Sequence, residues 1–310
     1  MILKLGLIKK LYNFLILSVI VNIFLMITYK NIGIQSARLG NQMSQYAAVL
    51  GIANKLKTNY AIPYKNFDAN GQMFNLDPNV QNWIRVNFRV PEGFEITAPN
   101  LTPELESKIE NTYEEGKTGK IGFDSDVFNL SPNTDIDGYF QCEKYWEHIE
   151  DIIRKEFTFK EEFRSKAESQ IAPIKEKYDE LVSLHFRRGD YVGNQNRHPL
   201  MPLSYYQEAI DMLVEDSTAL LIFSDDINWC KEQFGEDDRI YYITNNTDFV
   251  DMCMMSLCDH NVIANSTFSW WGAWLNPNPN KKVIAPKTWL GPEIKHLQSD
   301  DLYCKNWIVI

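Results

Sequence analysis

The sequence predicts an α/β protein built on parallel, doubly wound sheets. Short apolar runs alternate with helical segments through the second half of the chain, and a strand–helix–strand pattern opens the first half. This alternation is typical of parallel sheets, because two parallel strands need a crossover connection that is usually a helix. A chain of 310 residues is long enough for one large domain or two modest ones.

The amino-terminal segment predicts a membrane anchor. The run 11–29 contains no Asp, Glu, Lys or Arg and has roughly the 20 residues that cross a bilayer as a helix. Lys4, Lys9 and Lys10 precede it, and this excess of positive charge favours a cytoplasmic amino terminus. We therefore expect residues 1–30 to form a cytoplasmic tail and a signal anchor of a single-pass type II membrane protein, located in the Golgi if the source is eukaryotic. A cleaved signal peptide and a buried helix of the globular part are the alternatives.

The first of two expected domains comprises residues 31–175. Its helices are indicated by apolar side chains that recur at three- and four-residue steps. The expected elements are, in order, a strand at 32–36, a helix at 41–57, a strand at 59–63, loops with short helices at 64–135, and helices at 145–157 and 160–181.

The second expected domain comprises residues 176–310. Its strands are expected at 182–186, 219–223, 240–243, 261–264 and 283–285, and its helices at 203–214, 226–234, 248–258 and 266–275. Ligands of doubly wound sheets bind beyond the carboxyl ends of the strands. The polar residues that directly follow three of these strands, at 187–188, 224–226 and 265–269, should therefore converge on one crevice.

Arg187 and Arg188 stand at the end of a predicted strand, and Gly189 and Asp190 follow them. Arginine suits phosphate, because its planar guanidinium stays charged and forms bidentate hydrogen bonds. Successive side chains of an extended chain point to opposite sides. One arginine can therefore hold a diphosphate while the other pairs with Asp190 or another carboxylate. An exposed pair at a strand–loop junction is the alternative.

The run 265–274 combines hydroxyl groups with tryptophans. Ser266, Thr267 and Ser269 fall at the predicted start of a helix, where hydroxyls and free backbone N–H groups form an anion site. We expect the tryptophans to be mostly core and the hydroxyl and N–H groups to face phosphate.

Two further polar pairs follow strands. Asp225 and Asp226 can accept hydrogen bonds from a guanine edge or a ribose, and the alternative is a cap for the next helix. Asn41 and Gln42 follow Gly40 at the first strand–helix turn, and their amides can bind hydroxyl groups of a sugar or cap the helix.

The net charge of −10 argues against general nucleic-acid binding, which rests on Lys and Arg neutralising phosphates. A local basic site for a small phosphorylated ligand remains compatible with this charge. The sequence contains no P-loop, no G-x-G-x-x-G fingerprint and no C-x-x-C pair.

Four stretches resemble the signatures of the inverting α-1,2-fucosyltransferases of glycosyltransferase family 11. They are R-L-G-N-Q-M-S-Q-Y-A (Arg38–Ala47), D-G-Y-F-Q-C-E-K-Y (Asp137–Tyr145), H-F-R-R-G-D-Y (His185–Tyr191) and the long stretch Met255–Asn276. The resemblance covers essentially all of residues 32–290, in the expected order.

The resemblance implies a GT-B-like fold of two facing Rossmann-like domains. It implies transfer of fucose from GDP-fucose, with inversion, to the 2-hydroxyl of a galactose-containing acceptor glycan. Transfer to another acceptor and a non-catalytic, membrane-anchored carbohydrate-binding protein are the alternatives. The implied donor-site residues are His185, Arg187, Arg188, Asp225, Asp226, Asn265, Ser266, Thr267 and Ser269.

The remaining site residues concern the reaction and the acceptor. Asp190 is the candidate base, unless it only orients Arg187 or Arg188, and Asn41, Gln42 and Tyr191 are the candidate contacts to the sugar. No metal ion is expected. Pairs with D-x-D spacing occur at 124–126 and 135–137, but such pairs arise by chance in a chain with 41 acidic residues.

Overall fold

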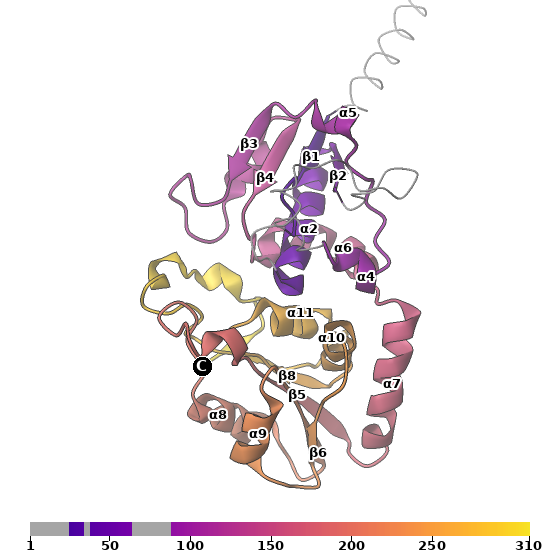
Figure 1. Ribbon diagram of the computed structural model, residues 1–310, viewed down its shortest axis with the longest axis vertical. Coiled ribbons are helices and arrows are strands. Elements are labelled where there is room, and N and C mark those ends of the chain that lie inside the picture. The colour runs from indigo at the N-terminus through magenta and orange to yellow at the C-terminus, as the bar shows by residue number, and fades with distance from the viewer. Residues whose placement is uncertain (1–24, 34–37, 64–87) are drawn as a thin grey trace, which may run out of the picture.

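The computed structural model describes residues 25–33, 38–63 and 88–310. They form two parallel sheets, each covered by helices and stacked along the long axis of the molecule (Figure 1). We call the first sheet with its helices the amino-terminal lobe and the second sheet with its helices the carboxy-terminal lobe. The predicted α/β class with parallel sheets is confirmed, whereas the proposed division at residue 175 stays a prediction.

The amino-terminal lobe is built on four strands in the order β2-β1-β4-β3, and every neighbouring pair is parallel. The strands are β1 (Met26–Thr28), β2 (Asn59–Ala61), β3 (Asn111–Glu114) and β4 (Thr134–Asp137). The helices are α2 (Leu39–Leu56), α4 (Val90–Gly93), α5 (Pro103–Glu106) and α6 (Glu150–Glu156), with 3-10 turns η1 (Ser125–Asn129), η2 (Glu143–Tyr145) and η3 (Glu147–Ile149).

The carboxy-terminal lobe has six parallel strands in the order β10-β9-β8-β5-β6-β7. The strands are β5 (Glu180–Phe186), β6 (Thr218–Ser224), β7 (Ile240–Tyr242), β8 (His260–Val262), β9 (Val283–Ala285) and β10 (Ile308–Val309). The helices are α7 (Glu161–Lys175), α8 (Leu203–Leu213), α9 (Ile227–Phe234), α10 (Asp248–Ser256) and α11 (Thr267–Leu275), with 3-10 turns η4 (Gly189–Tyr191), η5 (Lys295–Leu297) and η6 (Asp300–Leu302). The strand order reverses between β5 and β8, as in a doubly wound dinucleotide-binding fold.

An aromatic cluster joins the two lobes. Trp271 of α11 is fully buried and stacks on Trp146 of the amino-terminal lobe at a centroid distance of 5.4 Å. Phe157 meets the ring of Trp271 edge-on at 4.9 Å. The core of the amino-terminal lobe is therefore completed by a helix of the other lobe, and the expectation that the tryptophans are core is confirmed.

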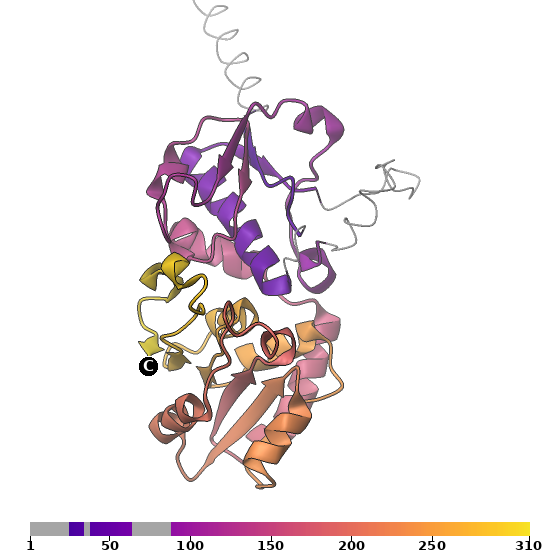
Figure 2. The same cartoon turned by 60° about the vertical axis from the view of Figure 1, so that its left-hand side comes forward.

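The end of the chain returns to the amino-terminal lobe before it forms β10. The indole Nε1 of Trp270 donates to the carbonyl of Leu302 at 2.8 Å. The carboxylate of Asp301 accepts from the backbone N–H of Phe123 at 3.0 Å and pairs with Lys144. Figure 2 shows this segment, in yellow, at the level where the lobes meet.

The predicted membrane anchor is contradicted. Met26–Thr28, inside the run 11–29, forms β1 between β2 and β4 instead of continuing a helix. Among residues 25–33, 38–63 and 88–310, no helix has both the length and the apolar composition needed to span a bilayer. The single-pass type II assignment and its Golgi location are therefore wrong, and residues 1–24 lie outside the described part. A run of apolar, β-branched residues suits a buried strand as well as a membrane helix.

Other elements differ from the sequence pattern in the amino-terminal lobe. Strand β3 and the first two residues of β4 were expected to be loops, because Asn and Asp are rare in strands. Asp135 of β4 is accommodated by the backbone N–H of Lys30, which donates to it at 2.8 Å. The predicted helix 145–157 is divided among η2, η3 and α6, and in the predicted strand 32–36 Ile32 lies in a turn.

The carboxy-terminal lobe follows the predictions closely. The predicted strands and helices from residue 182 to residue 285 are present, with ends shifted by a few residues. The charged helix 160–181 ends at Lys175, because β5 begins at Glu180. The short strand β10 carries no pattern of its own and was missed.

Replacing Trp146 by alanine tests the contribution of the aromatic cluster. Its ring is fully buried, so we expect Trp146→Ala to lower the free energy of unfolding by about 3–5 kcal/mol in urea denaturation. Met212→Ala, at a side chain that is 44% exposed, should change it by no more than about 0.5 kcal/mol. Equal small changes in both variants would contradict the role of the cluster.

Candidate active site

The carboxyl ends of the strands of both lobes face each other. In the carboxy-terminal lobe, the segments after β5, β6 and β8 make direct contacts: Arg187 pairs with Asp225, and His185 bonds to Ser269. The predicted convergence of these segments is confirmed. They meet where the strand order reverses between β5 and β8, which is the usual ligand site of such a sheet.

Arg187 is held by two carboxylates. Its Nη1 atom donates to Asp225 and its Nη2 atom to Asp190, and the guanidinium lies 5.2 Å from the ring centroid of Tyr191. The side chain is only 13% exposed, which excludes the alternative of a freely exposed surface pair. Two ion pairs fix the position of this cation before any ligand arrives.

Arg188 points to a different set of partners. Its Nε atom donates to Asp226 at 3.0 Å, and its guanidinium lies 3.7 Å from the ring centroid of Trp229. Both arginines therefore have a carboxylate partner, whereas the sequence suggested such a partner for one of them. The backbone turns after β5, and three acidic residues are within reach of the two guanidinium groups.

Asp225 and Asp226 have separate tasks. Asp225 accepts from the backbone N–H of Arg188 at 2.8 Å, and a Cβ atom at Gly189 would lie 2.4 Å from its carboxylate. A larger residue at position 189 would require this carboxylate to shift away from the backbone of Arg188. Asp226 caps α9 by accepting from the N–H of Trp229, so the capping alternative holds for Asp226 while it also binds Arg188.

The amino terminus of α11 carries unpaired polar groups. Ser266 is the N-cap residue, but its hydroxyl makes no capping bond, and the first turn of α11 contains no acidic residue. The Oγ atom of Ser269 is hydrogen-bonded to His185 Nδ1 at 2.8 Å. Backbone N–H groups and the positive end of the helix dipole therefore face the crevice.

The amino terminus of α2 meets that of α11. A Cβ atom at Gly40 would lie 2.5 Å from the backbone carbon of Thr267, so the two chains touch at this point. Asn41 Oδ1 accepts from Thr267 Oγ1 at 2.8 Å and from Gln141 Nε2 at 2.9 Å. The first turn of α2 also lacks an acidic residue and a side-chain cap. Two positive helix ends thus converge on one place.

His185 is neutral in the folded protein. Burial of the imidazole, together with the nearby guanidinium of Arg187, lowers the pKa of His185 from 6.5 to about 3. A neutral ring keeps one nitrogen as an acceptor and one as a donor. Its contact with Ser269 therefore depends on the tautomer.

The structure places the other predicted residues as follows. Gln42 is fully buried, and its Oε1 atom accepts from the backbone N–H of Arg89 at 2.7 Å, which is a packing role. Asn265 is also buried, and its Nδ2 atom donates to the carbonyls of Pro199 and Trp289, both at 3.0 Å. Tyr191 donates to the carbonyl of Asn265 at 3.2 Å. Asn265 therefore fixes two loops beside the crevice.

Two residues at the crevice were not singled out from the sequence. Arg38 reaches across from the amino-terminal lobe, and its Nη2 atom donates to Asp190 at 3.2 Å. Gln141 follows β4 and bonds to Asn41. Both belong to the stretches that carry the family resemblance, and that was the available signal. Asp190 therefore bridges a cation of each lobe.

The carboxylates of the two D-x-D pairs have partners other than Arg187 and Arg188. Asp124 and Asp126 both pair with Lys120 at 2.7 Å. Asp135 pairs with Lys30, and Asp137 accepts from the hydroxyl of Tyr29 at 2.9 Å. These carboxylates have protein partners that account for them. The absence of a metal requirement stays a prediction.

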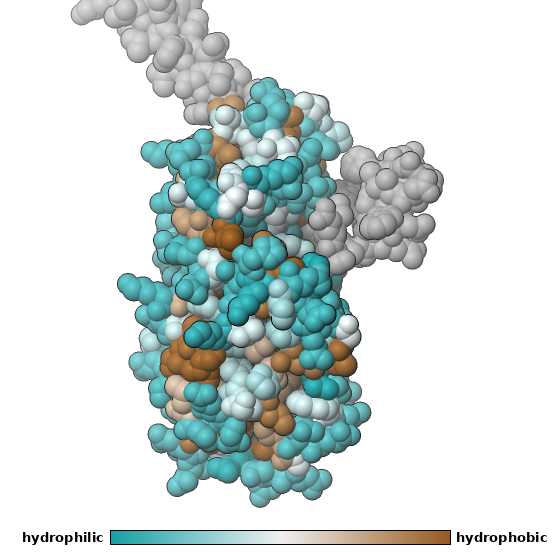
Figure 3. All heavy atoms as spheres, turned by 90° about the vertical axis from the view of Figure 1, so that its left-hand side faces the viewer, coloured by the Kyte–Doolittle hydropathy of each residue, from teal (hydrophilic) through white to brown (hydrophobic). Residues whose placement is uncertain are grey.

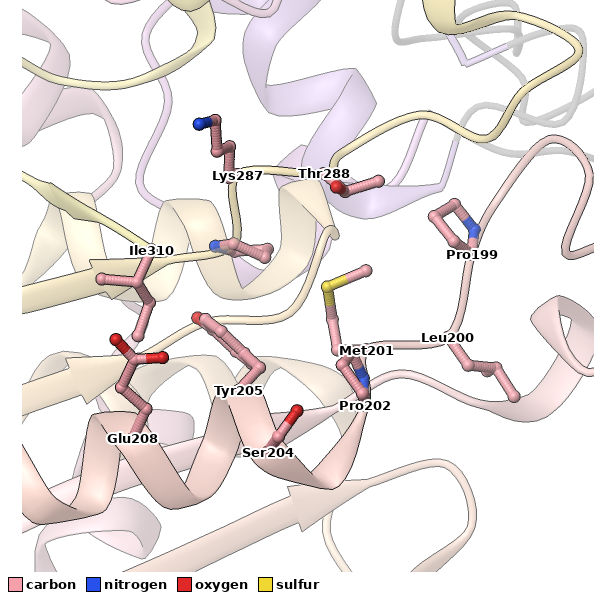
Figure 4. A pocket seen from close by; sticks show the side chains of 11 residues that line it. Pro199, Leu200, Met201, Pro202, Ser204, Tyr205, Glu208, Lys287, Thr288 and Ile310 are labelled. Atoms are coloured by element: carbon pink, nitrogen blue, oxygen red, sulfur yellow. The ribbon is translucent and has the colours of Figure 1, made fainter.

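A cavity of about 380 Å³ opens beside Asn265, between the loop before α8 and the segment after β9 (Figure 4). Pro199, Met201 and Tyr205 line one side, and Lys287, Thr288 and Ile310 line the other. The hydroxyl of Tyr205 is engaged with the carbonyls of Ile263 and Ile284, at 2.7 and 3.0 Å. The cavity therefore offers mainly apolar walls at the edge of the crevice.

Comparison with known proteins identifies the family. The model of glycosyl transferase family 11 matches residues 120–310. An α-1,2-colitosyltransferase of Escherichia coli is 33% identical over 291 residues, which cover 88% of this chain and 96% of that protein. The chain belongs to glycosyl transferase family 11. It is a fucosyltransferase-like glycosyltransferase, as the resemblance predicted.

More distant relatives and solved structures are also similar to this family 11 chain over most of its length. Human galactoside α-(1,2)-fucosyltransferase 1 is 23% identical over 254 residues, which cover 77% of this chain and 64% of that protein. Among solved structures, fucosyltransferase NodZ from Bradyrhizobium has a TM-score of 0.50 at 10% identity and covers 80% of this chain and 91% of its own. POFUT1 in complex with GDP-fucose has a TM-score of 0.51 at 13% identity, covering 84% and 98%. These likenesses show a GT-B-like fold.

The buried His185 predicts a pH dependence of stability for this family 11 chain. Because its pKa is lowered in the folded state, the stability linked to the neutral ring is fully present above pH 6.5 and is lost as the pH falls toward 3. As the pH falls through this window, we expect the free energy of unfolding of the wild type to decrease more steeply than that of His185→Asn. The difference in slope should be up to about 1.4 kcal/mol per pH unit. Urea denaturation at several pH values measures the slopes. The exposed His296→Asn serves as control and should keep the wild-type slope; an unchanged slope in His185→Asn would contradict the assignment.

Proposed function

We propose that this chain transfers fucose from GDP-fucose, with inversion, to the 2-hydroxyl of galactose in an acceptor glycan. The observation that carries the proposal is the pair of uncapped helix ends, α2 and α11, that meet beside Arg187 and Arg188. Such an arrangement suits a diphosphate, because the N–H groups of the two helix ends meet at one place and Asp190 links the guanidinium of Arg187 to Arg38, the residue before α2.

The donor is gripped mainly by the carboxy-terminal lobe. Arg187 and Arg188 contact the diphosphate, and the hydroxyls of Ser266, Thr267 and Ser269 complete its cradle. The nucleoside lies near His185, Asp225 and Asp226, with Asn265 holding the loops around it. The neutral state of His185 favours a hydrogen-bonding role there, since a neutral ring can both donate and accept.

The reaction breaks the bond between the anomeric carbon of fucose and the phosphate oxygen while the galactose oxygen attacks from the opposite face. Positive charge builds on the sugar, and negative charge builds on the departing GDP. Arg187, Arg188 and the N–H groups of both helix ends stabilise that negative charge without having to reorganise. We propose that no metal ion is required.

Asp190 is best suited to orient cations. Its two oxygens accept from Arg187 and from Arg38, one in each lobe. A role as base would require release from one of these guanidiniums, together with access to the acceptor hydroxyl. We therefore assign it the positioning of Arg187, with general-base catalysis as the alternative.

The acceptor enters from the amino-terminal lobe in this proposal. The Oδ1 atom of Asn41 is occupied by Thr267 and Gln141. Its two N–H donors, which have no partner among the described residues, are left for a sugar hydroxyl. Tyr191 stacks on His198 at 4.8 Å, and the guanidinium of Arg187 lies over its ring at 5.2 Å from the centroid. Gln42 supports this wall through Arg89, since its own amide is buried.

A second candidate is transfer of colitose in place of fucose. It is favoured by the 33% identity to the α-1,2-colitosyltransferase over 88% of this chain. The identity to the human galactoside fucosyltransferase is lower, at 23%, but it supports the galactose acceptor. Transfer to a different acceptor, and a carbohydrate-binding protein without turnover, are further outcomes of the same experiment.

The purified chain should be incubated with labelled GDP-fucose, with the corresponding colitose donor and with other nucleotide sugars, each with a panel of galactosides. We expect fucosyl transfer to a galactoside that persists in EDTA. Preferred transfer of colitose would establish the second candidate. No transfer from GDP-fucose to any galactoside, with or without divalent metal, would refute the main proposal.

The role of Arg187 has its own test. We expect Arg187→Ala to reduce turnover by at least about 100-fold, because a preorganised cation facing the leaving group is lost. Its urea midpoint should stay close to that of the wild type. Arg239→Ala removes an exposed arginine that pairs with Asp237 at the opposite end of the sheet, and it should retain full activity. Near-normal turnover in Arg187→Ala would exclude the phosphate role.

A further inference from the structure

The conformation of the turn formed by residues 138–141, directly after β4, is not explained by donor binding. It belongs to the stretch D-G-Y-F-Q-C-E-K-Y, whose role the donor chemistry leaves open. The turn lies at the carboxyl end of β4, on the side of the sheet that faces the carboxy-terminal lobe. Its last residue, Gln141, bonds to Asn41 in the crevice.

The backbone of the 138–141 turn is held in an unusual conformation. Gly138 has φ 153° and Phe140 has φ 50°, a value that L side chains rarely adopt. The carboxylate of Glu115, from the end of β3, accepts from the N–H groups of Tyr139 at 2.7 Å and Phe140 at 2.9 Å. A Cβ atom at Gly138 would lie 2.4 Å from Cβ of Glu115, so only glycine fits. Unfavourable backbone conformations persist where the surroundings enforce them, and they cluster at functional sites.

The conformation separates two neighbouring aromatic rings. Phe140 is fully buried and meets the ring of Tyr145 edge-on at 5.2 Å. Tyr139 is 50% exposed, and its hydroxyl has no hydrogen-bond partner within the described part of the chain. Phe140 therefore anchors the turn, while Tyr139 is presented to solvent without contributing to the core.

Tyr139 lies close to the residues through which the two lobes meet. It is two residues from Gln141, so their Cα atoms lie within about 7 Å of each other. The amide of Gln141 reaches Asn41, and Asn41 reaches Thr267 at the start of α11. The surface on the left-hand side of Figure 1, where the loops after β3 and β4 lie, is mostly hydrophilic with separate hydrophobic patches (Figure 3). An exposed aromatic ring on such a surface suits a ligand that is polar overall but has one apolar face.

We propose that Tyr139 is the platform for the acceptor sugar, with its ring against the C–H face of the galactose residue. This inference rests on the proposed function, because it assigns the acceptor side of the same reaction. A pyranose ring offers C–H groups on one face and hydroxyls around its edge. In this proposal the aromatic ring packs against the C–H groups, and the N–H donors of Asn41 and Gln141 bind the hydroxyls. Glu115 acts as a positioning residue that holds the turn.

Steady-state kinetics of the full chain test the platform. We expect Tyr139→Ala to raise the KM for the galactoside acceptor about tenfold, which corresponds to about 1.4 kcal/mol. The KM for the nucleotide-sugar donor and the calorimetric affinity for GDP should stay within about twofold. Tyr139→Phe keeps the ring and should restore the acceptor KM to near the wild-type value. Ile152→Ala, at another side chain that is 47% exposed but lies on α6, is the control and should change neither constant.

The outcomes separate this inference from the proposed function. If the wild type shows no transfer from any nucleotide sugar, the proposed function fails. If the wild type transfers sugar and Tyr139→Ala keeps the wild-type acceptor KM, the platform is refuted and the function stands. A purely structural role is recognised by a lowered urea midpoint together with equal losses for donor and acceptor, and this result also overturns the proposal.

Discussion

The contact between the amino termini of α2 and α11 is the constraint on which the rest of the site depends. At Gly40 the two backbones approach so closely that a Cβ atom would lie 2.5 Å from Thr267. Each helix belongs to a different lobe, so this contact, together with the stacking of Trp271 on Trp146, fixes how the lobes face one another. It also brings two positive helix ends together, an arrangement that is unfavourable unless an anion lies between them.

The cost of holding those helix ends together is offset by the aromatic face of α11. Trp270, Trp271 and Trp274 are all buried, and Trp271 stacks on Trp146 of the other lobe. One side of a nine-residue helix thus supplies packing, while its amino terminus supplies N–H groups to the crevice. At the carboxyl end of α11, the ammonium of Lys281 donates to the carbonyls of Ala273 and Asn276 at 2.7 Å. Both ends and one face of α11 are therefore fixed, and the N–H groups that α11 contributes to the site are held rigidly as a result.

The sequence predicts the carboxy-terminal lobe better than the amino-terminal lobe for a physical reason. Strands such as Thr218–Ser224 are buried on both faces and contain a continuous apolar run, and the arginine pair follows another buried strand, Glu180–Phe186. In contrast, β4 carries two aspartates whose partners, Lys30 and Tyr29, are remote in sequence. The apolar run that contains β1 resembled a membrane helix. The pairing of Arg187 with Asp225, and of Arg38 with Asp190, also depends on tertiary contacts that no local pattern contains.

The three carboxylates around the arginine pair are not equivalent, and this difference bears on how a diphosphate enters. Asp225 is fixed by the backbone N–H of Arg188, and Asp226 is fixed as the cap of α9. Asp190 has no such backbone anchor among the described residues. Its side chain is 52% exposed, and it joins Arg187 to Arg38 across the lobes. Water can solvate Asp190 on release at little cost, whereas moving either of the others would break a backbone bond. An incoming diphosphate that competes for Arg187 would therefore displace Asp190 first, and the same step would free Arg38 to meet the ligand from the opposite lobe.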